Sequence, residues 1–452
     1  MDKKYDFIVV GTGLAGMTVA LKLAKDKERV LLIEKEHFLG GRTSSWDDNG
    51  FEVESGFHKQ IGYYKRLPKL LKEVGVKLDD IVAWEKETEI IINKHKKIVF
   101  GISPFHNPGT FIKDFLGNRE VLSIKDKLSM TKLFIRGFID YKFNPKELDN
   151  YSILEYSKKL NITDNVIDYI VTSLSTGIFF MQKEEYSAKL FFGLFYPALF
   201  RVIKLRIGAY KKGMTEVLIN PIAEDFKKYG GEVFPNTKVT SLIEEQEEIK
   251  GVKTTSGNYY GFVVLATDLG NTKEIIETLD NKNKEKILSI PTTSAISVQI
   301  DLTKKIMLLD RATFAPLIIN TSFTEESRTT FKKKGGRLSI ILGDPEKYID
   351  LNDETIFKLV VHEFKKIGIN IKKEVLDYRV VKHKDKYYRF SKGNDDKRCL
   401  NDIGIKNLIV AGDYTRQKFY CTMEGAVISG INAYEKIKEI KKLWFIFIKI
   451  IR

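Results

Sequence analysis

Residues 5–45 read YDFIVVGTGLAGMTVALKLAKDKERVLLIEKEHFLGGRTSS, and the type of fold can be inferred from this segment. The apolar run at residues 7–10 predicts a strand that is buried on both faces. Apolar residues then recur at helical intervals over residues 14–24, and a second apolar run follows at residues 29–33. Strand, helix and strand in this order, with glycines at the first turn, predict a βαβ unit that opens a parallel sheet.

The first turn carries Gly11, Gly13 and Gly16 at the spacing G-x-G-x-x-G, and the second strand ends in Glu34. The first glycine permits the tight turn, the second lets a pyrophosphate approach the backbone, and the third lets the helix pack closely. The helix N-terminus offers free N–H groups to phosphates. Glu34 is placed to accept hydrogen bonds from an adenosine ribose. These features predict a dinucleotide site, without separating NAD from FAD.

Composition describes a globular protein of 452 residues, with 43% hydrophobic and 30% charged residues. The length suffices for two or three domains. The net charge is +15, from 75 basic and 60 acidic residues, but the basic residues are scattered and form no nucleic-acid-binding pattern. Nucleic acid is therefore not an expected partner. A lysine-rich surface explains the charge as well as any function does.

The cellular compartment can be inferred from the two cysteines, Cys399 and Cys421. They cannot form a disulfide framework and do not have the spacing of a metal site. The chain shows no signal-peptide pattern at its start. We therefore expect a reducing, cytoplasmic location and no bound metal.

Three further segments carry the family signal. Gly40-Gly41-Arg42-Thr43 follows the acidic strand end, and residues 51–64 read FEVESGFHKQIGYY. Residues 407–430 read NLIVAGDYTRQKFYCTMEGAVISG, with a buried strand before Gly412-Asp413 and a helix opening at Met423. These segments resemble the FAD-dependent amine oxidase and phytoene desaturase superfamily, and they are most similar to the plant and cyanobacterial phytoene desaturase type.

The resemblance implies an α/β fold in which a glutathione-reductase-type Rossmann FAD domain is interleaved with an α+β substrate domain. The expected FAD-binding domain is discontinuous and comprises residues 1–64, 206–272 and 395–440. Residues 65–205 and 273–394 are expected to form the substrate domain. In the second FAD-binding segment we expect a helix at 212–229, strands at 230–233 and 237–242, a hairpin from 249–254 and 259–260, and a buried strand at 262–267.

The resemblance also implies which residues hold FAD. The expected cofactor-binding residues are Gly11, Gly13, Leu14, Ala15, Gly16, Glu34, Lys35, Gly41, Arg42, Thr43, Gly56, Phe57, His58, Val239, Ala266, Gly412, Asp413, Met423, Glu424 and Ala426. Val239 is expected to meet the adenine end through its backbone, and Asp413 the ribityl or phosphate region. The helix opening at Met423 is expected to face the flavin C2 carbonyl and N1, where its N–H groups stabilise negative charge.

The substrate region is less informative. His58 is a weak catalytic candidate, and a packed, hydrogen-bonded histidine is the alternative. The aromatic run at residues 190–200 predicts either a buried helix or the wall of a lipophilic channel. Strands at 294–302 and 338–342 with a helix at 353–367 predict a sheet with one covering helix. Lys304 and Lys305 are interpreted as surface lysines.

The last residues, 441–452, read KKLWFIFIKIIR, which is too short an apolar stretch to span a bilayer. Two interpretations stay open for this tail. It suits an interfacial anchor on an anionic membrane surface, which would place the protein peripherally on the inner face of the membrane. It also suits a docked C-terminal helix that covers a gap in the core.

The resemblance implies an oxidoreductase that desaturates a lipophilic isoprenoid or carotenoid-type substrate by hydride transfer to flavin N5, with a quinone or another membrane acceptor reoxidising the flavin. Three alternatives stay open. One is an amine oxidase with an aromatic cage drawn from Tyr387, Tyr388 and Tyr420. The second is a redox-neutral isoprenoid flavoenzyme, of the carotenoid isomerase or hydroxysqualene dehydroxylase type. The third is a flavin-bound scaffold without catalysis.

Overall fold

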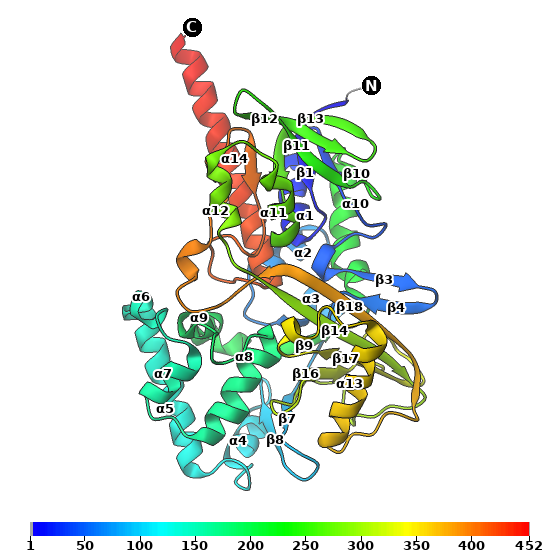
Figure 1. Ribbon diagram of the computed structural model, residues 1–452, viewed down its shortest axis with the longest axis vertical. Helices are drawn as coiled ribbons and strands as arrows, with labels where there is room; N and C mark the ends of the chain where they lie inside the picture. Colours follow the sequence, from blue (N-terminus) through cyan, green and yellow to red (C-terminus); the bar gives the residue numbers. More distant parts are fainter. Residues whose placement is uncertain (1–2, 452) are drawn as a thin grey trace.

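The computed structural model describes residues 3–451, without the side chains of residues 3, 111, 114–116 and 444–451. The fold is α/β, as the sequence predicts. Two sheets of seven strands each form its two halves, the upper and the lower half in Figure 1. A layer of helices lies beside the lower sheet at the left of that view.

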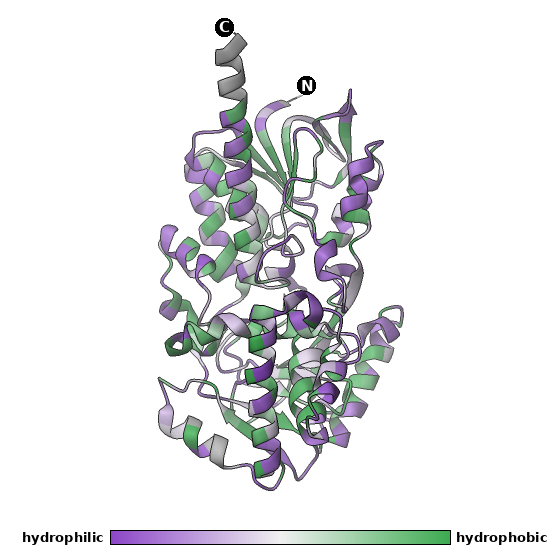
Figure 2. Cartoon of the chain, turned by 90° about the vertical axis from the view of Figure 1, so that its left-hand side faces the viewer, coloured by the Kyte–Doolittle hydropathy of each residue, from purple (hydrophilic) through white to green (hydrophobic). Residues whose placement is uncertain are grey.

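The upper sheet is the dinucleotide-binding type. Its strands are β1 (Lys3–Val10), β2 (Val30–Ile33), β10 (Glu232–Phe234), β11 (Val239–Glu245), β12 (Glu248–Thr254), β13 (Gly257–Leu265) and β19 (Leu408–Val410). The order is β10-β2-β1-β13-β12-β11, with β19 pairing with β13. Strands β10, β2, β1, β13 and β19 run parallel, and their apolar residues are buried. Figure 2 shows these central strands largely in green.

Helix α1 (Leu14–Lys25) lies in the layer that covers this sheet, and its residues are buried on nearly every side. It packs between α10 (Asn220–Lys228) and the C-terminal helix α14 (Met423–Ile451). Helix α14 continues through the predicted tail without a break, so residues 441–451 are helical. The anchoring prediction depends on side chains that lie outside the described ones. Among the described residues, no helix is long and apolar enough to cross a membrane.

One predicted boundary in this half is wrong. The expected hairpin strand at 259–260 and the buried strand at 262–267 form one continuous strand, β13. Its first part pairs antiparallel with β12, and it also runs parallel to β1. Gly261 lies at the register shift in the pairing of β13 with β1, where a Cβ would lie 2.6 Å from the carbonyl oxygen of Tyr5. The glycine therefore allows a close approach of the two backbones within one strand.

The lower sheet has the order β18-β14-β17-β16-β15-β7-β8. Its strands are β7 (Glu87–Ile91), β8 (Lys97–Gly101), β14 (Thr292–Leu302), β15 (Thr313–Phe314), β16 (Ser322–Glu325), β17 (Gly336–Ile341) and β18 (Val375–Tyr388). The predicted covering helix is α13 (Asp353–Lys366), which begins at the capping side chain of Asn352. Ile296, Val298 and Ile300 share an apolar core with α13, so the alternate residues of β14 face the upper half.

The helical layer consists of α4 (Pro108–Leu116), α5 (Ile124–Phe143), α6 (Pro145–Leu148), α7 (Ile153–Lys159), α8 (Thr172–Phe179) and α9 (Ala188–Leu199). The remaining strands and α-helices are β3 (Ser45–Asp48), β4 (Phe51–Glu54), β5 (Lys59–Ile61), β6 (Val82–Trp84), β9 (Ile207–Tyr210), α2 (Arg66–Glu73), α3 (Leu78–Ile81), α11 (Leu269–Glu277) and α12 (Glu285–Leu288). Strands β5, β9 and β6 form a small sheet.

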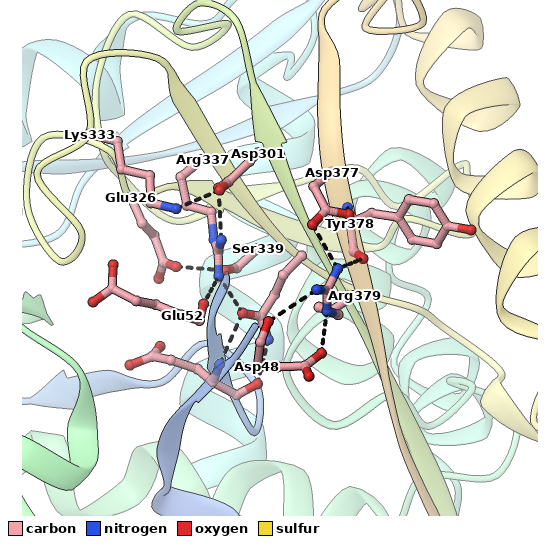
Figure 3. Close-up of polar contacts among 12 residues, drawn as sticks. Asp48, Glu52, Asp301, Glu326, Lys333, Arg337, Ser339, Asp377, Tyr378 and Arg379 are labelled. Carbon is pink, nitrogen blue, oxygen red and sulfur yellow. Dashed lines mark hydrogen bonds and ion pairs between the residues drawn. The ribbon is translucent and has the colours of Figure 1, made fainter. Parts of the chain in front are cut away.

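The β3–β4 hairpin is fastened to the lower sheet by two arginines (Figure 3). The buried Arg337 on β17 donates to Asp301 at 2.7 Å and to the backbone carbonyl of Glu52, and its guanidinium lies 4.0 Å from the ring centroid of Phe51. Arg379 on β18 donates to Asp48. These contacts fix the hairpin from which the next residues, 55–58, extend.

Candidate functional site

A cavity of about 1060 Å³ extends from the carboxyl ends of β1, β2 and β13 to the inner face of the lower sheet. The carboxyl edge of a parallel sheet is where such folds bind ligands. The predicted cofactor residues that line the cavity are Gly11, Gly13, Leu14, Ala15, Glu34, Lys35, Gly41, Arg42, Thr43, Gly56, Phe57, His58, Val239, Ala266, Gly412, Asp413, Met423 and Ala426. Segments far apart in sequence therefore meet around one space.

Two predicted cofactor residues, Gly16 and Glu424, do not line the cavity. A Cβ at Gly16 would lie 2.0 Å from the carbonyl oxygen of Gly11, so this glycine serves the packing of the turn. The buried Glu424 accepts backbone N–H bonds from Lys65 and Leu67 at 2.7 and 2.9 Å, and also one from the residue between them. Its carboxylate is therefore the N-terminal cap of α2, and Glu424 does not border the cavity.

Glycines keep the phosphate end of the cavity open. Gly13 is the N-cap of α1 and supplies no capping side chain. A Cβ at Gly13 would have the carbonyl oxygen of Gly40 as its nearest neighbour, at 3.9 Å, and a Cβ at Gly41 would lie 3.6 Å from the Cα of Gly13. The first-turn N–H groups of α1 thus meet open space bounded by backbone, which suits a pyrophosphate.

Glu34 lies at the end of β2, where the sequence predicts it. Its carboxylate accepts hydrogen bonds from the Thr12 hydroxyl at 2.5 Å and backbone N–H at 3.1 Å, and from the Glu36 N–H at 3.1 Å. The Thr12 hydroxyl in turn accepts from the N–H of Gly40. Glu34 therefore ties the glycine turn to the Gly40-Gly41 loop, and its side chain still borders the cavity.

Arg42 and Asp413 form an ion pair across the cavity wall. The Arg42 guanidinium also lies 4.6 Å from the ring centroid of Tyr387, a residue of β18. Asp413 follows β19, so this pair and the ring connect the upper sheet to the lower one. The pair fixes both side chains in the cavity wall, where sequence analysis expects the cofactor.

Two histidines border the cavity. His58 Nδ1 donates to the carbonyl oxygen of Gly56 at 2.7 Å, and burial lowers the pKa of His58 to about 4. His383, which sequence analysis missed, lies 3.0 Å from the Ser55 hydroxyl through Nε2, and burial lowers its pKa as well. Both rings are therefore neutral near pH 7 and hold the loop at residues 55–58.

The half of the cavity between the loop at 55–58 and the lower sheet is largely apolar. Its apolar lining includes Ile61, Ile178, Phe179, Phe180, Leu194, Phe195, Leu205, Ile207, Ala312, Phe314 and Ile341. The aromatic run at residues 190–200 forms part of the cavity wall and also part of the core. Leu194 and Phe195 line the cavity, whereas Phe191 and Phe192 are fully buried in the core.

The aromatic cage considered for an amine oxidase is not assembled. Tyr387 borders the cavity, but Tyr388 and Tyr420 do not. Both pack on Phe390, and the Tyr420 hydroxyl pairs with that of Tyr186. Lys304 forms an exposed ion pair with Glu374 at 2.8 Å, in agreement with its interpretation as a surface lysine.

His383 and Tyr387 belong to the cavity through the pairing of β18 with β14, which sets Ala295 opposite His383. No local motif marks His383. Sequence analysis considers Tyr387 only as part of an aromatic cage. Pairing between strands far apart in the chain brings these side chains to the site, and this pairing cannot be predicted from a single sequence.

Known proteins of two kinds resemble the chain over nearly its full length. It is 24% identical to 15-cis-phytoene desaturase of Capsicum annuum, over 95% of this chain and 77% of that protein. It is also 24% identical to zeta-carotene desaturase of Synechocystis, over 95% of this chain and 96% of that protein.

Solved structures show the same fold. Putrescine oxidase bound to putrescine matches with a TM-score of 0.76 at 16% identity, covering 97% of this chain and all of that one, 100%. An oxidoreductase from Methanosarcina mazei matches with a TM-score of 0.75 at 18% identity over 96% of this chain and 100% of that one. The family model described as flavin containing amine oxidoreductase matches residues 14–437. The chain therefore belongs to the flavin-containing amine oxidoreductase family, whose expected cofactor is FAD.

Proposed function

We propose that this protein is an FAD-dependent oxidoreductase that dehydrogenates a lipophilic isoprenoid-type substrate. The observation that carries the proposal is the cavity itself, in which an apolar half adjoins a glycine-lined half at the edge of the parallel sheet. The similarity to two carotenoid-pathway desaturases supports this substrate class. A long apolar ligand requires such a lining.

The residues present fit FAD. The open backbone cradle at Gly13 and Gly41 would take the pyrophosphate, and Glu34 would meet the adenosine ribose. Arg42, Asp413 and the first turn of α14 would border the ribityl chain and ring. When bound, FAD supplies a two-electron acceptor for a hydride from a substrate C–H bond.

This assignment gives the two parts of the chain different roles. Residues 1–64, 206–272 and 395–440 would bind the cofactor, and residues 65–205 and 273–394 would enclose the substrate. The apolar walls exclude water and orient the substrate chain beside the cofactor. The substrate loses its second hydrogen as a proton. Nδ1 of His58 donates its hydrogen to the carbonyl oxygen of Gly56, so Nε2 of the neutral ring carries the free lone pair. His58 is therefore a candidate proton acceptor.

An amine oxidase is the second candidate, since putrescine oxidase shares the fold. The burial of Tyr388 and Tyr420 away from the cavity argues against an aromatic cage of the kind considered. A redox-neutral isoprenoid flavoenzyme would have the same apolar cavity. Product analysis separates it from a desaturase.

We also propose that the substrate enters from an anionic lipid surface on the helical side. Exposed apolar side chains lie on α5, at the end of α9 and in the segment that follows α9, namely Ile124, Leu128, Ile135, Ile139, Phe143, Leu199, Phe200 and Ile203. Exposed basic residues on α5, such as Lys125, Lys132 and Lys142, lie among them. Phe195 and Leu205, which flank residues 199–203 in sequence, line the cavity, and such an exposed apolar surface suits contact with lipid.

The direct test is turnover with a soluble quinone as oxidant. We expect a product two hydrogens lighter than the isoprenoid supplied, together with one reduced quinone for each new double bond. A product of unchanged mass would support the redox-neutral alternative. Oxidation of polyamines alone, with release of hydrogen peroxide, would overturn the proposal.

A further inference from the structure

Two serine hydroxyls in the apolar half of the cavity have no hydrogen-bond partner among the described residues. They are Ser297 on β14 and Ser322 on β16, whose residues are 3% and 2% exposed. Both residues line the cavity. Another hydroxyl of the same lining is satisfied by the protein, because Thr88 donates to the carbonyl oxygen of Ala312 at 2.7 Å.

The two serines project from one face of the lower sheet. Ser297 and Ser322 are each paired with Ile341 of the intervening strand β17, so the three side chains form a row. Two strand spacings set the hydroxyls on the order of 10 Å apart. The row lies beneath the loop at residues 55–58, because a Cβ at Gly56 would lie 3.8 Å from Ile341 Cδ1 and 4.0 Å from Ser297 Cβ.

This arrangement does not match a pure hydrocarbon. A buried hydroxyl that contacts only apolar groups loses its bonds to water and gains nothing in return. A ligand oxygen at either position would restore a hydrogen bond. Lys59, a cation in the cavity lining, is already paired with Glu85 at 2.8 Å, so its charge is compensated within the protein. A neutral oxygen function fits better than a phosphate or carboxylate.

We infer that Ser297 and Ser322 are specificity-determining residues, and that the substrate is an isoprenoid-type molecule that carries a hydroxyl or carbonyl oxygen. This inference rests on the proposed function and narrows its substrate class. The two hydroxyls bracket the apolar contact with Ile341, so an oxygen bound at one serine fixes the position of the chain along the cavity.

The test compares a long polyprenyl alcohol with the hydrocarbon that lacks only its hydroxyl. Binding to the FAD-loaded enzyme is followed by the change in the flavin absorption spectrum. We expect the wild type to bind the alcohol about tenfold or more tightly than the hydrocarbon. In the double variant Ser297→Ala, Ser322→Ala the two affinities should become equal, with hydrocarbon affinity kept or improved.

Ser327→Ala is the matched control. Ser327 is 1% exposed and its hydroxyl also has no partner among the described residues, but it does not line the cavity. This variant should keep the preference for the alcohol. Thermal unfolding of the ligand-free proteins adds a second readout, since the alanines at 297 and 322 should leave Tm unchanged or higher. A lowered Tm with an unchanged preference would show a structural role and overturn the inference.

The remaining outcomes are also distinct. If the hydrocarbon binds and is dehydrogenated, but the alcohol binds no more tightly, the inference fails and the proposed function stands. If neither isoprenoid perturbs or reduces the flavin, both fail.

Discussion

At the scale of single residues, His58 links the site to pH. Burial lowers its pKa from 6.5 to about 4, so the unfolded chain binds its proton first as the pH falls. The stability of the fold should therefore decrease between about pH 6.5 and pH 4, by up to about 3 kcal/mol from this group. His58→Gln should flatten that part of the profile, as measured by chemical denaturation at several pH values. Equal slopes in both proteins would contradict the assignment.

Gly13 and Gly16 should respond differently to the same substitution. Gly13→Ala adds a Cβ into open space at a backbone φ of −61°, so the ligand-free protein should be as stable as the wild type. FAD affinity should nevertheless fall at least about tenfold, because the Cβ occupies the place of the pyrophosphate. Gly16→Ala should destabilise the protein itself, since its Cβ meets the carbonyl oxygen of Gly11 at 2.0 Å. Calorimetry and flavin fluorescence titration distinguish the two effects. Unchanged FAD affinity in Gly13→Ala would argue against the phosphate site.

Local patterns predict these residues well, because a glycine turn and a strand-end acid act within one βαβ unit. The same reasoning does not reveal that Glu424 caps α2. Its carboxylate follows Met423, a cavity residue, but the helical twist directs it to α2, more than three hundred residues earlier in the chain. His383 is missed for the related reason that only strand pairing places it beside Ser55.

At the scale of elements, α2 depends on the C-terminal helix for its cap. Glu424→Gln should lower the free energy of unfolding by about 2 kcal/mol, since a charged acceptor of several N–H groups is lost. Once folded, the variant should bind FAD normally. The control is Glu439→Gln, an exposed position of the same helix α14, which should change little. A selective loss of FAD affinity without loss of stability would restore Glu424 to the cofactor site.

Local sequence patterns predict individual elements of the two halves but not how the elements of the lower sheet are ordered. Buried apolar runs and amphipathic periods predict β1, β2, α13 and α14 because those patterns are local. The order of the lower sheet is not predictable in this way, since β7 and β8 join strands that come two hundred residues later. The arginine contacts of the β3–β4 hairpin likewise join segments that no sequence period relates.

At the scale of the whole molecule, the exposed apolar side chains of α5 and of the segment at residues 199–203 should bind lipid. Phe200 and Ile203 are 73% and 62% exposed, and replacing both with Asp should reduce flotation with anionic liposomes. Leu308→Asp is the control, because Leu308 is 85% exposed on the lower-sheet side. Truncation after Lys441 tests the tail separately. Full flotation of the double variant, with loss in the truncated protein, would assign lipid binding to the tail instead.

The proposed function requires that the apolar cavity presents an isoprenoid to FAD for dehydrogenation. Anaerobic bleaching of the flavin in the purified protein tests it most directly, with detergent-dispersed phytoene, squalene and a polyprenyl alcohol beside a panel of polyamines. We expect loss of the oxidised flavin spectrum with an isoprenoid and none with the polyamines. Bleaching by polyamines alone would contradict it and make the protein an amine oxidase.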